Sequence, residues 1–372
     1  MSRFNYVATC LFGMEKFICD DIAALGYEKT DSMDGRVFFS GDEEAIARCS
    51  LWLHTAECLY IEVGRGKTLS FEELFDLAIG LPWEHFIGKQ DSFPVSGHSI
   101  KSKLFSVPDC QKIIKKAIAT RLGGKYGASW LAEDGAKIPV EFFIFKDTAY
   151  LMIDTSGVGL HKRGYRLKAN DAPLRETLAS GMVAISRLDR DTMLWDPMCG
   201  SGTIPIEAAL RLNNVAPGLN RSFLFEDFPW YDKALTEKAR QEARDVMLHE
   251  KICIYGSDID GDCIELSKEN ARRAGVEADI RFFRMDVQKF FDPGKRGTVV
   301  TNPPYGERLL TPEKAMALYK KMGRAFEAVE RWHLYILCSN ESFEEGFGKK
   351  ADKVRKLYNG MLKCNLYEYF RR

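Results

Sequence analysis

The chain has 372 residues, 45% of them hydrophobic, which is enough for two or three domains with buried cores. Lys plus Arg and Asp plus Glu both total 53, so a polyanionic partner would have to meet a local basic patch, since the overall charge supplies no attraction. There is no run of eighteen apolar residues and no signal peptide at the start, so we expect a soluble protein of the cytoplasm with no membrane partner.

The first part of the chain predicts one or two small α+β modules. Short apolar or alternating segments indicate strands, and segments with helical periodicity lie between them. The expected strands are residues 4–10, 36–41, 58–64, 92–100, 138–145 and 148–154. The expected helices are residues 14–26, 42–53 and 109–122. The basic stretch 160–171 is the expected link to the rest of the chain.

From about residue 170 onward strands and helices alternate, which is typical of βαβ units in a doubly wound parallel sheet. The expected strands are residues 192–197, 252–258, 280–286, 298–302 and 333–339, and the expected helices are residues 202–212, 261–275 and 313–329. Two β-rich segments then flank Asn359-Gly360, which favours a hairpin with a type I′ turn. The sheet should therefore end in an antiparallel pair.

The ten cysteines predict neither a disulfide framework nor a metal centre. They form no C-x-x-C pair and no His/Cys cluster at zinc spacing. Cytosolic chains rarely carry disulfides, so we expect most of these thiols to be buried and reduced.

Residues 196–203, DPMCGSGT, form the first candidate binding motif. A predicted strand ends in a glycine-rich turn before an apolar helix, which points backbone N–H groups at a ligand. The motif lacks the third glycine of a dinucleotide fingerprint and the Gly-Lys-Ser/Thr of a phosphate loop, so a different nucleoside ligand is implied. The alternative is a plain tight turn. The candidate ligand-binding residues are Asp196, Pro197, Cys199, Gly200, Gly202 and Thr203.

Two aspartates follow the next two predicted strands. Asp258 in GSDID can accept both hydroxyls of a ribose, while Ile259 offers an apolar face to a base. Asp286 in RMDV can accept the exocyclic amine of adenine. Each aspartate alone could instead be a turn or helix cap. Their order along the chain favours one binding site at the strand ends.

The stretch 301–308, TNPPYGER, follows a fourth apolar strand. With the three motifs before it, it resembles the class I S-adenosylmethionine-dependent methyltransferases that modify exocyclic amines of bases, over roughly residues 170–372. The resemblance implies S-adenosylmethionine as the cofactor, with Asn302 also lying in the donor site. A proline-stiffened loop is the alternative interpretation.

The chemistry of such a reaction explains these residue types. An exocyclic amine is a poor nucleophile, and the Asn302 side-chain oxygen and the Pro303 carbonyl can accept its two hydrogens and favour the pyramidal amine. Pro303 and Pro304 stiffen the segment, and Tyr305 can stack on an extruded base. Asn302 is a feeble general base, so positioning should dominate and the proton should leave to solvent. No cysteine lies in this motif to support covalent catalysis.

Residues 92–127 and 140–166 resemble the THUMP RNA-binding module, and residues 1–60 resemble a small ferredoxin-like piece. One face of the predicted helix 109–122 is apolar and the opposite face carries lysines, which could form a phosphate track or simply be solvated. The candidate RNA-binding residues are Lys101, Lys103, Lys112, Lys115, Lys116, Lys162, Arg163 and Arg166.

SGVGLHKRGYR followed by APLRETLASGM is similar to the junction in bacterial large-subunit ribosomal RNA guanine-N2 methyltransferases. We therefore predict an α/β chain: a ferredoxin-like module at 1–62, a THUMP domain at 63–165, and a Rossmann-like class I methyltransferase domain at 166–372. The chain lacks the second methyltransferase domain of larger members, and its segment 213–250 is long.

The resemblance implies methylation of guanine N2 in RNA, with 23S rRNA or its assembly precursor as the partner. An N6-adenine methyltransferase acting on DNA or RNA, and an inactive RNA-binding protein, stay open as alternatives. The sequence leaves the modified nucleotide and the oligomeric state open.

Overall fold

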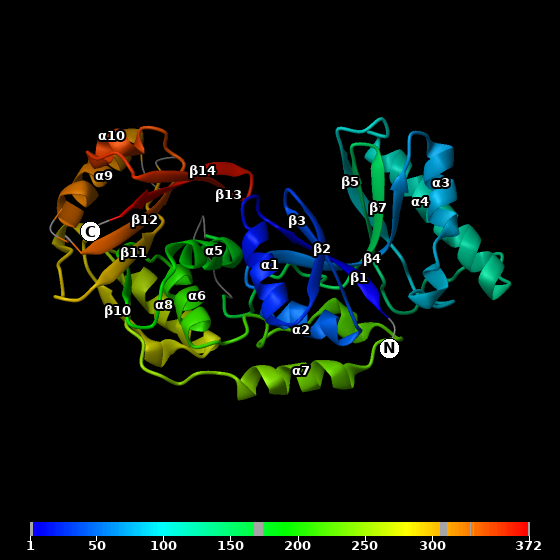
Figure 1. Ribbon diagram of the computed structural model, residues 1–372, viewed down its shortest axis with the longest axis horizontal. Coiled ribbons are helices and arrows are strands. Elements are labelled where there is room, and N and C mark those ends of the chain that lie inside the picture. The colour runs from blue at the N-terminus through cyan, green and yellow to red at the C-terminus, as the bar shows by residue number, and fades with distance from the viewer. Residues whose placement is uncertain (1–2, 167–173, 306–310, 328, 330, 371–372) are drawn as a thin grey trace.

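The computed structural model describes residues 3–166, 174–305, 311–327, 329 and 331–370. Residues 167–171 of the predicted linker and 306–308 of the fourth motif lie outside the described residues. Figure 1 shows the parts in a row, with the C-terminal α/β domain on the left, the first module in the centre and the second module on the right.

The first module has the βαββαβ order of a ferredoxin-like fold. Its elements are β1 (Phe4–Cys10), α1 (Glu15–Ala24), β2 (Glu28–Met33), β3 (Arg36–Gly41), α2 (Glu44–Trp52) and β4 (Ala56–Lys67). Strand β2 is a polar edge strand that pairs only with β3 among the described strands, so it shows none of the apolar alternation by which strands were predicted.

The second module continues the same sheet. It contains α3 (Phe71–Gly80), the 3-10 turn η1 (Trp83–His85), β5 (Val95–Ile100), α4 (Val107–Tyr126), β6 (Val140–Phe145) and β7 (Thr148–Asp154). The seven strands run in the order β2-β3-β1-β4-β7-β6-β5. β4 pairs with β1 on one side and β7 on the other, so the boundary predicted between residues 62 and 63 falls inside this strand.

The sheet bends sharply at β4. The pairing of β4 with β7 shifts register between Glu62 and Gly64, which marks a bulge. As a result, the Arg36 guanidinium of β3 lies 3.5 Å from the ring centroid of Phe143 on β6, although three strands separate them in the sheet. The two halves of the sheet therefore face each other across a shared apolar cluster.

The C-terminal domain is a doubly wound α/β sheet, as predicted. Its strands are β8 (Met193–Asp196), β9 (Ile254–Asp258), β10 (Ile280–Arg284), β11 (Gly297–Thr301), β12 (Trp332–Cys338), β13 (Lys353–Asn359) and β14 (Leu362–Tyr369). They run in the order β10-β9-β8-β11-β12-β14-β13, with the first five parallel. β11 is buried along its whole length, as expected for a central parallel strand.

Helices cover both faces of this sheet, with a separate apolar core on each face. They are α5 (Glu176–Ser186), α6 (Thr203–Leu212), α8 (Gly261–Ala274), α9 (Pro312–Glu327) and α10 (Phe343–Phe347). Short 3-10 turns are η3 (Glu277–Asp279) and η4 (Val287–Lys289). No helix of the described residues is long and apolar enough to cross a membrane.

The terminal hairpin is present, but the predicted turn is shifted by one residue. Asn359 pairs with Leu362, so the two loop residues are Gly360 and Met361 rather than Asn359 and Gly360. Of these two, only Gly360 has a positive φ, at 64°. Glycine at the first central position is typical of a type II′ turn, so the type I′ prediction was wrong.

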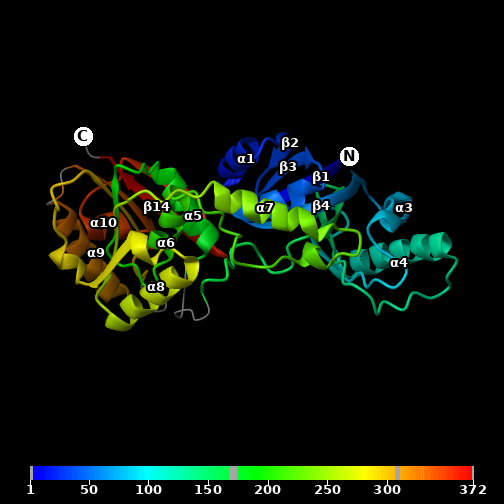
Figure 2. The ribbon, with the colours of Figure 1, turned by 90° about the horizontal axis from the view of Figure 1, so that it is seen from below.

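The long segment 213–250 docks the C-terminal domain onto the first module. It contains η2 (Leu224–Asp227) and α7 (Lys233–Asp245), which lies beside the first module in Figures 1 and 2. Phe225, Tyr231 and Ala239 of this segment belong to the same apolar core as the N-terminal sheet. Gly218 N–H also donates to the Leu51 carbonyl at 2.9 Å. The segment is thus a brace between the two halves of the molecule.

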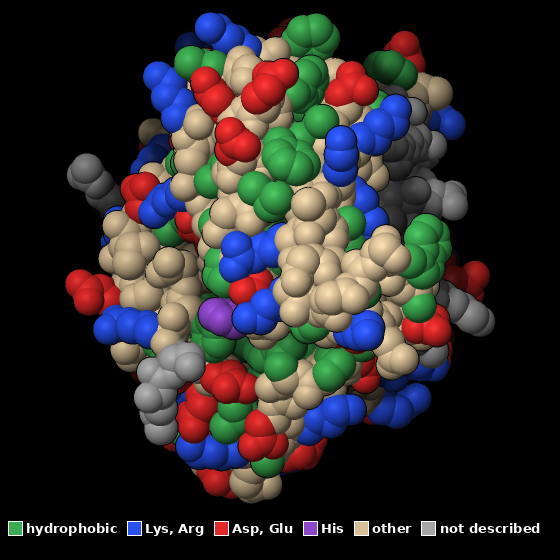
Figure 3. All heavy atoms as spheres, turned by 90° about the vertical axis from the view of Figure 1, so that its right-hand side faces the viewer, with side chains coloured by type: hydrophobic (Ala, Val, Ile, Leu, Met, Phe, Trp, Pro, Cys, Tyr) green, Lys and Arg blue, Asp and Glu red, His purple; other side chains and the backbone are tan. Residues whose placement is uncertain are grey.

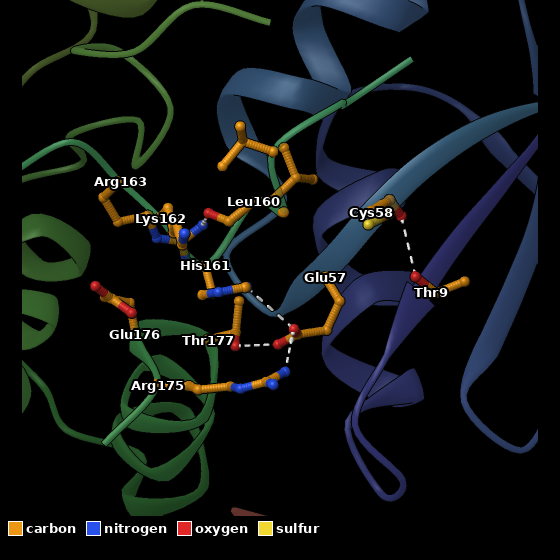
Figure 4. A network of polar contacts seen from close by, with 12 residues as sticks. Thr9, Glu57, Cys58, Leu160, His161, Lys162, Arg163, Arg175, Glu176 and Thr177 are labelled. Carbon is orange, nitrogen blue, oxygen red and sulfur yellow. Dashed lines mark hydrogen bonds and ion pairs between the residues drawn. The ribbon is translucent and has the colours of Figure 1, made fainter. Parts of the chain in front are cut away.

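A second joint lies at the start of β4 (Figure 4). Glu57 accepts hydrogen bonds from Arg175 Nη1 at 2.7 Å and from the Thr177 hydroxyl, and it lies 3.2 Å from His161 Nδ1. Burial raises the pKa of Glu57, but the hydrogen bonds from His161 and Thr177 and the charge of Arg175 outweigh it, so the pKa lies below its usual value. The carboxylate therefore fixes the first module against the start of α5.

Candidate active site

The four predicted motifs meet at one edge of the C-terminal sheet. β10, β9, β8 and β11 are parallel neighbours, so the loops that follow them leave the sheet on the same side. The strand order reverses between β8 and β11, and ligands of open α/β sheets bind in the crevice at such a point. The sheet therefore brings together Asp196, Asp258, Asp286 and Asn302, the residues that end or follow these strands.

The glycine-rich loop is held close to its neighbours. Gly200 has φ 52° and Gly202 has φ 81°, backbone conformations that disfavour other residues. A Cβ on Gly202 would lie 3.0 Å from the Cβ of Ser267, so this turn leaves no room for a side chain. The Ser267 hydroxyl donates to the Gly200 carbonyl at 2.7 Å, and Asn270 Nδ2 donates to the Ser201 carbonyl at 3.0 Å.

Asp196 joins the first motif to the fourth. Its Oδ1 accepts from the Thr301 hydroxyl at 2.7 Å and from Met198 N–H at 3.1 Å, and the residue is buried. Burial raises the pKa of Asp196 to about 7, partly offset by the hydrogen bond from Thr301. Because Thr301 directly precedes Asn302, this carboxyl links the glycine-rich loop to the predicted amine clamp.

Asp258 connects the first and second motifs. Its Oδ2 accepts from Gly200 N–H at 2.9 Å, and its Oδ1 accepts from Asp260 N–H at 3.0 Å. Burial raises the pKa of this carboxyl. Ile259 beside it is 60% exposed, so its side chain forms an open apolar surface next to the carboxylate.

Asp286 caps the short turn η4. Its Oδ1 accepts from Gln288 N–H and its Oδ2 accepts from Gln288 Nε2, both at 2.9 Å. This is the capping arrangement that the sequence left open for this residue. The contact of Asp286 with an adenine amine stays a prediction.

The Asn302 side chain is held by Tyr305. The Tyr305 hydroxyl donates to Asn302 Oδ1, and the ring of Tyr305 packs against both cores of the domain. Burial raises the pKa of the Tyr305 hydroxyl well above its usual value, so it stays protonated as a donor. The Tyr319 hydroxyl donates to the Pro304 carbonyl at 3.0 Å. These contacts position Asn302. Stacking of the partly buried Tyr305 ring on an extruded base stays a prediction.

The predicted basic residues separate into different environments. Lys101, Lys103, Lys112, Lys116 and Lys162 are exposed. The ammonium of Lys115 instead lies 2.6 Å from Glu133 Oε2, 3.1 Å from the Phe93 carbonyl and 3.4 Å from the Phe93 ring centroid. Lys115 is therefore tied within the second module.

Arg163 and Arg166 do not lie on the lysine face. Arg163 is 3% exposed, donates to the carbonyls of Leu160 and His54, and lies 3.6 Å from Glu207. Its guanidinium is enclosed between the modules, which corrects the prediction that it reaches RNA.

Arg166 lies at the glycine-rich loop. Its guanidinium donates to the Thr203 hydroxyl and to the Leu174 carbonyl at 3.1 Å, and it pairs with Glu176 at 3.5 Å. This side chain thus supports the first motif, and its assignment to RNA is corrected as well.

The sequence reasoning missed several residues that support the site. Thr301, Ser267 and Asn270 each hydrogen-bond to the first motif, and Arg166 was assigned to RNA. Ser267 and Asn270 lie three residues apart on α8, and therefore on one helix face, but helical spacing alone does not mark a residue as functional. Among the described residues, no group of three His, Cys, Asp or Glu side chains could hold a metal ion.

The residues present fit S-adenosylmethionine. The Asp258 carboxylate suits ribose hydroxyls, Ile259 suits a base, and the glycine loop lets backbone approach a ligand closely. Asn302 lies next to this loop through the Thr301–Asp196 contact, where a methyl acceptor would have to lie. The site therefore accommodates both a nucleoside donor and an amine.

Three family models match successive parts of the chain. Residues 5–58 match the RlmL ferredoxin-like domain, residues 69–154 match the THUMP domain, and residues 163–368 match the RMKL-like methyltransferase domain. These matches and the strand order confirm the predicted fold class.

Two curated relatives match at least 98% of the chain. The chain is 44% identical over 374 residues to "Putative RNA methyltransferase YpsC" of Bacillus subtilis, covering 100% of this chain and 97% of that protein. It is 32% identical over 374 residues to "Ribosomal RNA large subunit methyltransferase K/L" of Psychromonas ingrahamii, covering 98% of this chain. This chain spans 50% of the length of the K/L protein.

Solved structures show the same architecture. A structure from Listeria monocytogenes, described as a predicted N6-adenine-specific DNA methylase, matches with TM-score 0.94 and 46% identity, covering 100% of this chain and 97% of that one. SMU.472, described as a putative methyltransferase complexed with SAH, matches with TM-score 0.92 and 40% identity, covering 100% and 99%. The chain therefore belongs to the RMKL-like methyltransferase family, carries its ferredoxin-like and THUMP modules, and uses S-adenosylmethionine as its methyl donor.

Proposed function

We propose that this protein transfers a methyl group from S-adenosylmethionine to the exocyclic N2 amine of a guanine in RNA. The substrate is 23S rRNA or its assembly precursor, and the reaction takes place in the cytoplasm. The THUMP module and the names of the two curated relatives support RNA as the substrate. The buried thiols of Cys49, Cys110 and Cys199, which form no disulfide, fit a reducing compartment.

The observation that carries the proposal is the position of Asn302. The Tyr305 hydroxyl fixes its side chain, and Thr301 ties its backbone to Asp196 beside the donor loop. Asn302 Oδ1 and the Pro303 carbonyl take the two amine hydrogens, so the nitrogen lone pair turns toward the donor methyl. The donor, when bound, supplies an activated methyl group on a sulfonium.

The reaction is a direct displacement at that methyl carbon. The amine nitrogen forms the new N–C bond, the C–S electron pair stays on sulfur, and the extra proton passes from nitrogen to solvent. Asn302 orients the amine and carries no proton, because its neutral amide is a weak base. The protein thus contributes positioning rather than covalent catalysis.

The proposal is tested by methylation followed by nucleoside analysis. Ribosomal RNA from a strain that lacks the protein is incubated with the purified protein and labelled S-adenosylmethionine, then digested to nucleosides. N2-methylguanosine is the expected product, and Asn302→Ala serves as the matched control.

The second candidate is methylation of adenine N6. The clamp suits either amine, and the Listeria structure carries that description. If the nucleoside analysis finds N6-methyladenosine in RNA or DNA, adenine N6 is the amine that the enzyme methylates and the guanine proposal is wrong. An absence of label in every nucleic acid, despite donor binding, would contradict both and favour an inactive RNA-binding protein.

A further inference from the structure

The second module ends in a tip that combines exposed apolar and basic side chains. We call residues 67–69, 100–106 and 145–148 the THUMP tip. It lies where β4 and β6 end, β7 begins and β5 leads into α4, at the upper end of the second module in Figure 1. Phe105 in this tip is 81% exposed, and Ile100 and Leu69 are also exposed. Exposed apolar side chains that gather in one place, unlike single scattered ones, mark interaction sites.

The loops of the tip are bonded to one another through Asp147. Its carbonyl accepts from Thr68 N–H at 2.7 Å, its Oδ1 accepts from Lys103 N–H at 2.7 Å, and its N–H donates to the Ser102 hydroxyl at 3.1 Å. Phe105 N–H donates to the Lys103 carbonyl at 3.1 Å. The exposed ring is therefore presented by a hydrogen-bonded scaffold, which reduces the entropy lost when a partner binds.

The charge of the tip fits a polyanion. Four exposed lysines belong to it, and they are Lys67, Lys101, Lys103 and Lys146. Its one acidic residue, Asp147, uses a carboxylate oxygen to accept a backbone N–H. Figure 3 shows basic and hydrophobic side chains beside each other along the upper edge of this half, with acidic ones among them.

The nearby acids belong to the adjoining helix starts. Glu73 accepts from Leu69 N–H at 2.7 Å, and the Ser106 hydroxyl donates to Asp109. Glu73 therefore caps a backbone N–H at the start of α3, and Asp109 is bonded to a side chain at the start of α4. The lysines remain the groups of the tip that are available to phosphates.

We propose that the THUMP tip binds an unpaired nucleotide of the RNA substrate, with its base stacked on Phe105 and its flanking phosphates on the lysines. The inference rests on the proposed RNA function and adds the kind of RNA that the second module requires. Stacking on an aromatic ring needs a base face, which a continuous duplex hides. The substrate should therefore have a single-stranded segment or loop that reaches the tip while another nucleotide enters the active site.

The test compares two RNA probes and two aromatic variants of the full chain. The probes are a short hairpin RNA and the same hairpin with an unpaired 3′ extension of about six nucleotides. Phe105→Ala should weaken binding of the extended probe about tenfold and leave the blunt hairpin unchanged. Trp130→Ala is the matched control, because Trp130 is also 81% exposed but follows the far end of α4. It should bind both probes as the wild type does.

Two further measurements separate stacking from charge. Phe105→Trp should restore the affinity lost in Phe105→Ala, because an indole also stacks. Phe105→Ala should keep the wild-type salt dependence, while the double variant Lys101→Gln/Lys103→Gln should reduce the slope of log affinity against log salt by about 1.4. Thermal unfolding of each variant should match the wild type, because these side chains are exposed.

Equal affinity of Phe105→Ala and wild type for the extended probe would overturn the proposal and favour a protein partner for the ring. Equal losses on both probes, or an equal loss in Trp130→Ala, would also overturn it. Failure of the wild type to bind either probe would count against RNA as the substrate, and so against the proposed function itself. RNA binding without methyl transfer would contradict the proposed reaction but not the proposed role of the THUMP tip. In that case the affinities of the Phe105 variants alone decide whether the tip binds RNA.

Discussion

The hydroxyl of Tyr305 and the amide of Asn302 form a pair that the sequence alone could not show. NPPY suggested a ring that stacks on a base, because motif chemistry does not show what else a phenol contacts. In the structure the ring also packs against two cores, and its hydroxyl orients the Asn302 oxygen. Arg163 was misassigned for a related reason: a basic stretch does not show which of its side chains a neighbouring module will cover.

Substitutions in this pair should separate the roles of amide and phenol. Asn302→Ala should lower the single-turnover rate of methyl transfer about 100-fold, because it removes an acceptor used in the transition state. Tyr305→Phe keeps the ring but loses the hydroxyl that orients the amide, so a fall of about tenfold is expected. RNA affinity should change little in either variant. A wild-type rate for Asn302→Ala would contradict the clamp.

Asp196 predicts a dependence of stability on pH. Burial raises its pKa to about 7, whereas the pKa of an unfolded aspartate is ~3.9. The folded state therefore binds more protons between about pH 4 and pH 7, and its stability falls as the pH rises through that range. Asp196→Asn cannot ionise, so its free energy of unfolding relative to wild type should rise from pH 5 to pH 7 and then level off.

Urea unfolding at a series of pH values, without donor, measures this difference. Burial also raises the pKa of Asp21 to about 6, so Asp21 adds its own pH dependence to the stability of both proteins. This contribution cancels in the difference between the variant and the wild type. A difference that stays constant across the range would contradict the assignment.

Most elements followed from the sequence, since apolar strands and amphipathic helices of the C-terminal domain match their predicted ranges closely. β2 was not predicted because it is a polar edge strand, and α7 was not predicted because its buried face consists of the small residues Thr236, Ala239 and Ala243. The sequence also did not predict α3, α5 and α10. The predicted turn of the β13–β14 hairpin was wrong by one residue, because the sequence is compatible with two registers. One register has Asn359 and Gly360 in the turn, and the observed one has Gly360 and Met361. The pairing of β14 with both β12 and β13 fixes the observed register.

Two glycine substitutions, one in the hairpin turn and one at the end of α3, should have opposite effects on stability. Gly360→Ala should destabilise the protein by ~1 kcal/mol, because φ 64° disfavours a side chain even though the surrounding space is open. Gly80→Ala at the end of α3 also enters open space but needs no positive φ, so it should stabilise by up to ~0.5 kcal/mol. Chemical denaturation of both variants tests the pair, and similar shifts would contradict the assigned turn.

Three of the lysines of α4 should contribute unequally to RNA binding. Lys112 and Lys116 are exposed, whereas Lys115 is bonded to Glu133 and the Phe93 carbonyl. Lys112→Gln/Lys116→Gln should reduce the salt slope of RNA affinity by about 1.4–1.8 if both contact phosphates. Lys115→Gln should leave that slope unchanged and lower stability instead. Equal slopes for all variants would mean that the face is merely solvated.

Glu57 is one of the contacts that fix the first module to the C-terminal domain. Glu57→Ala removes the acceptor of Arg175 and Thr177 and should cost about 1–3 kcal/mol of stability. It should also lower methyl transfer to RNA while leaving donor affinity unchanged, because RNA must engage both halves at once. Glu44→Ala removes an exposed ion pair with Lys238 between α2 and α7, and serves as the control with little effect. Equal behaviour of the two variants would argue against Glu57 as the joint.

The strand β4 also determines how this protein can be divided or recombined. β4 pairs with β1 through residues 56–62 and with β7 through residues 60–67, so a cut between residues 62 and 63 would leave an open sheet edge on each fragment. Open edges pair with other chains, so each fragment should be prone to aggregation. A chimaera that borrows the RNA preference of a relative should therefore exchange residues 4–154 as one block.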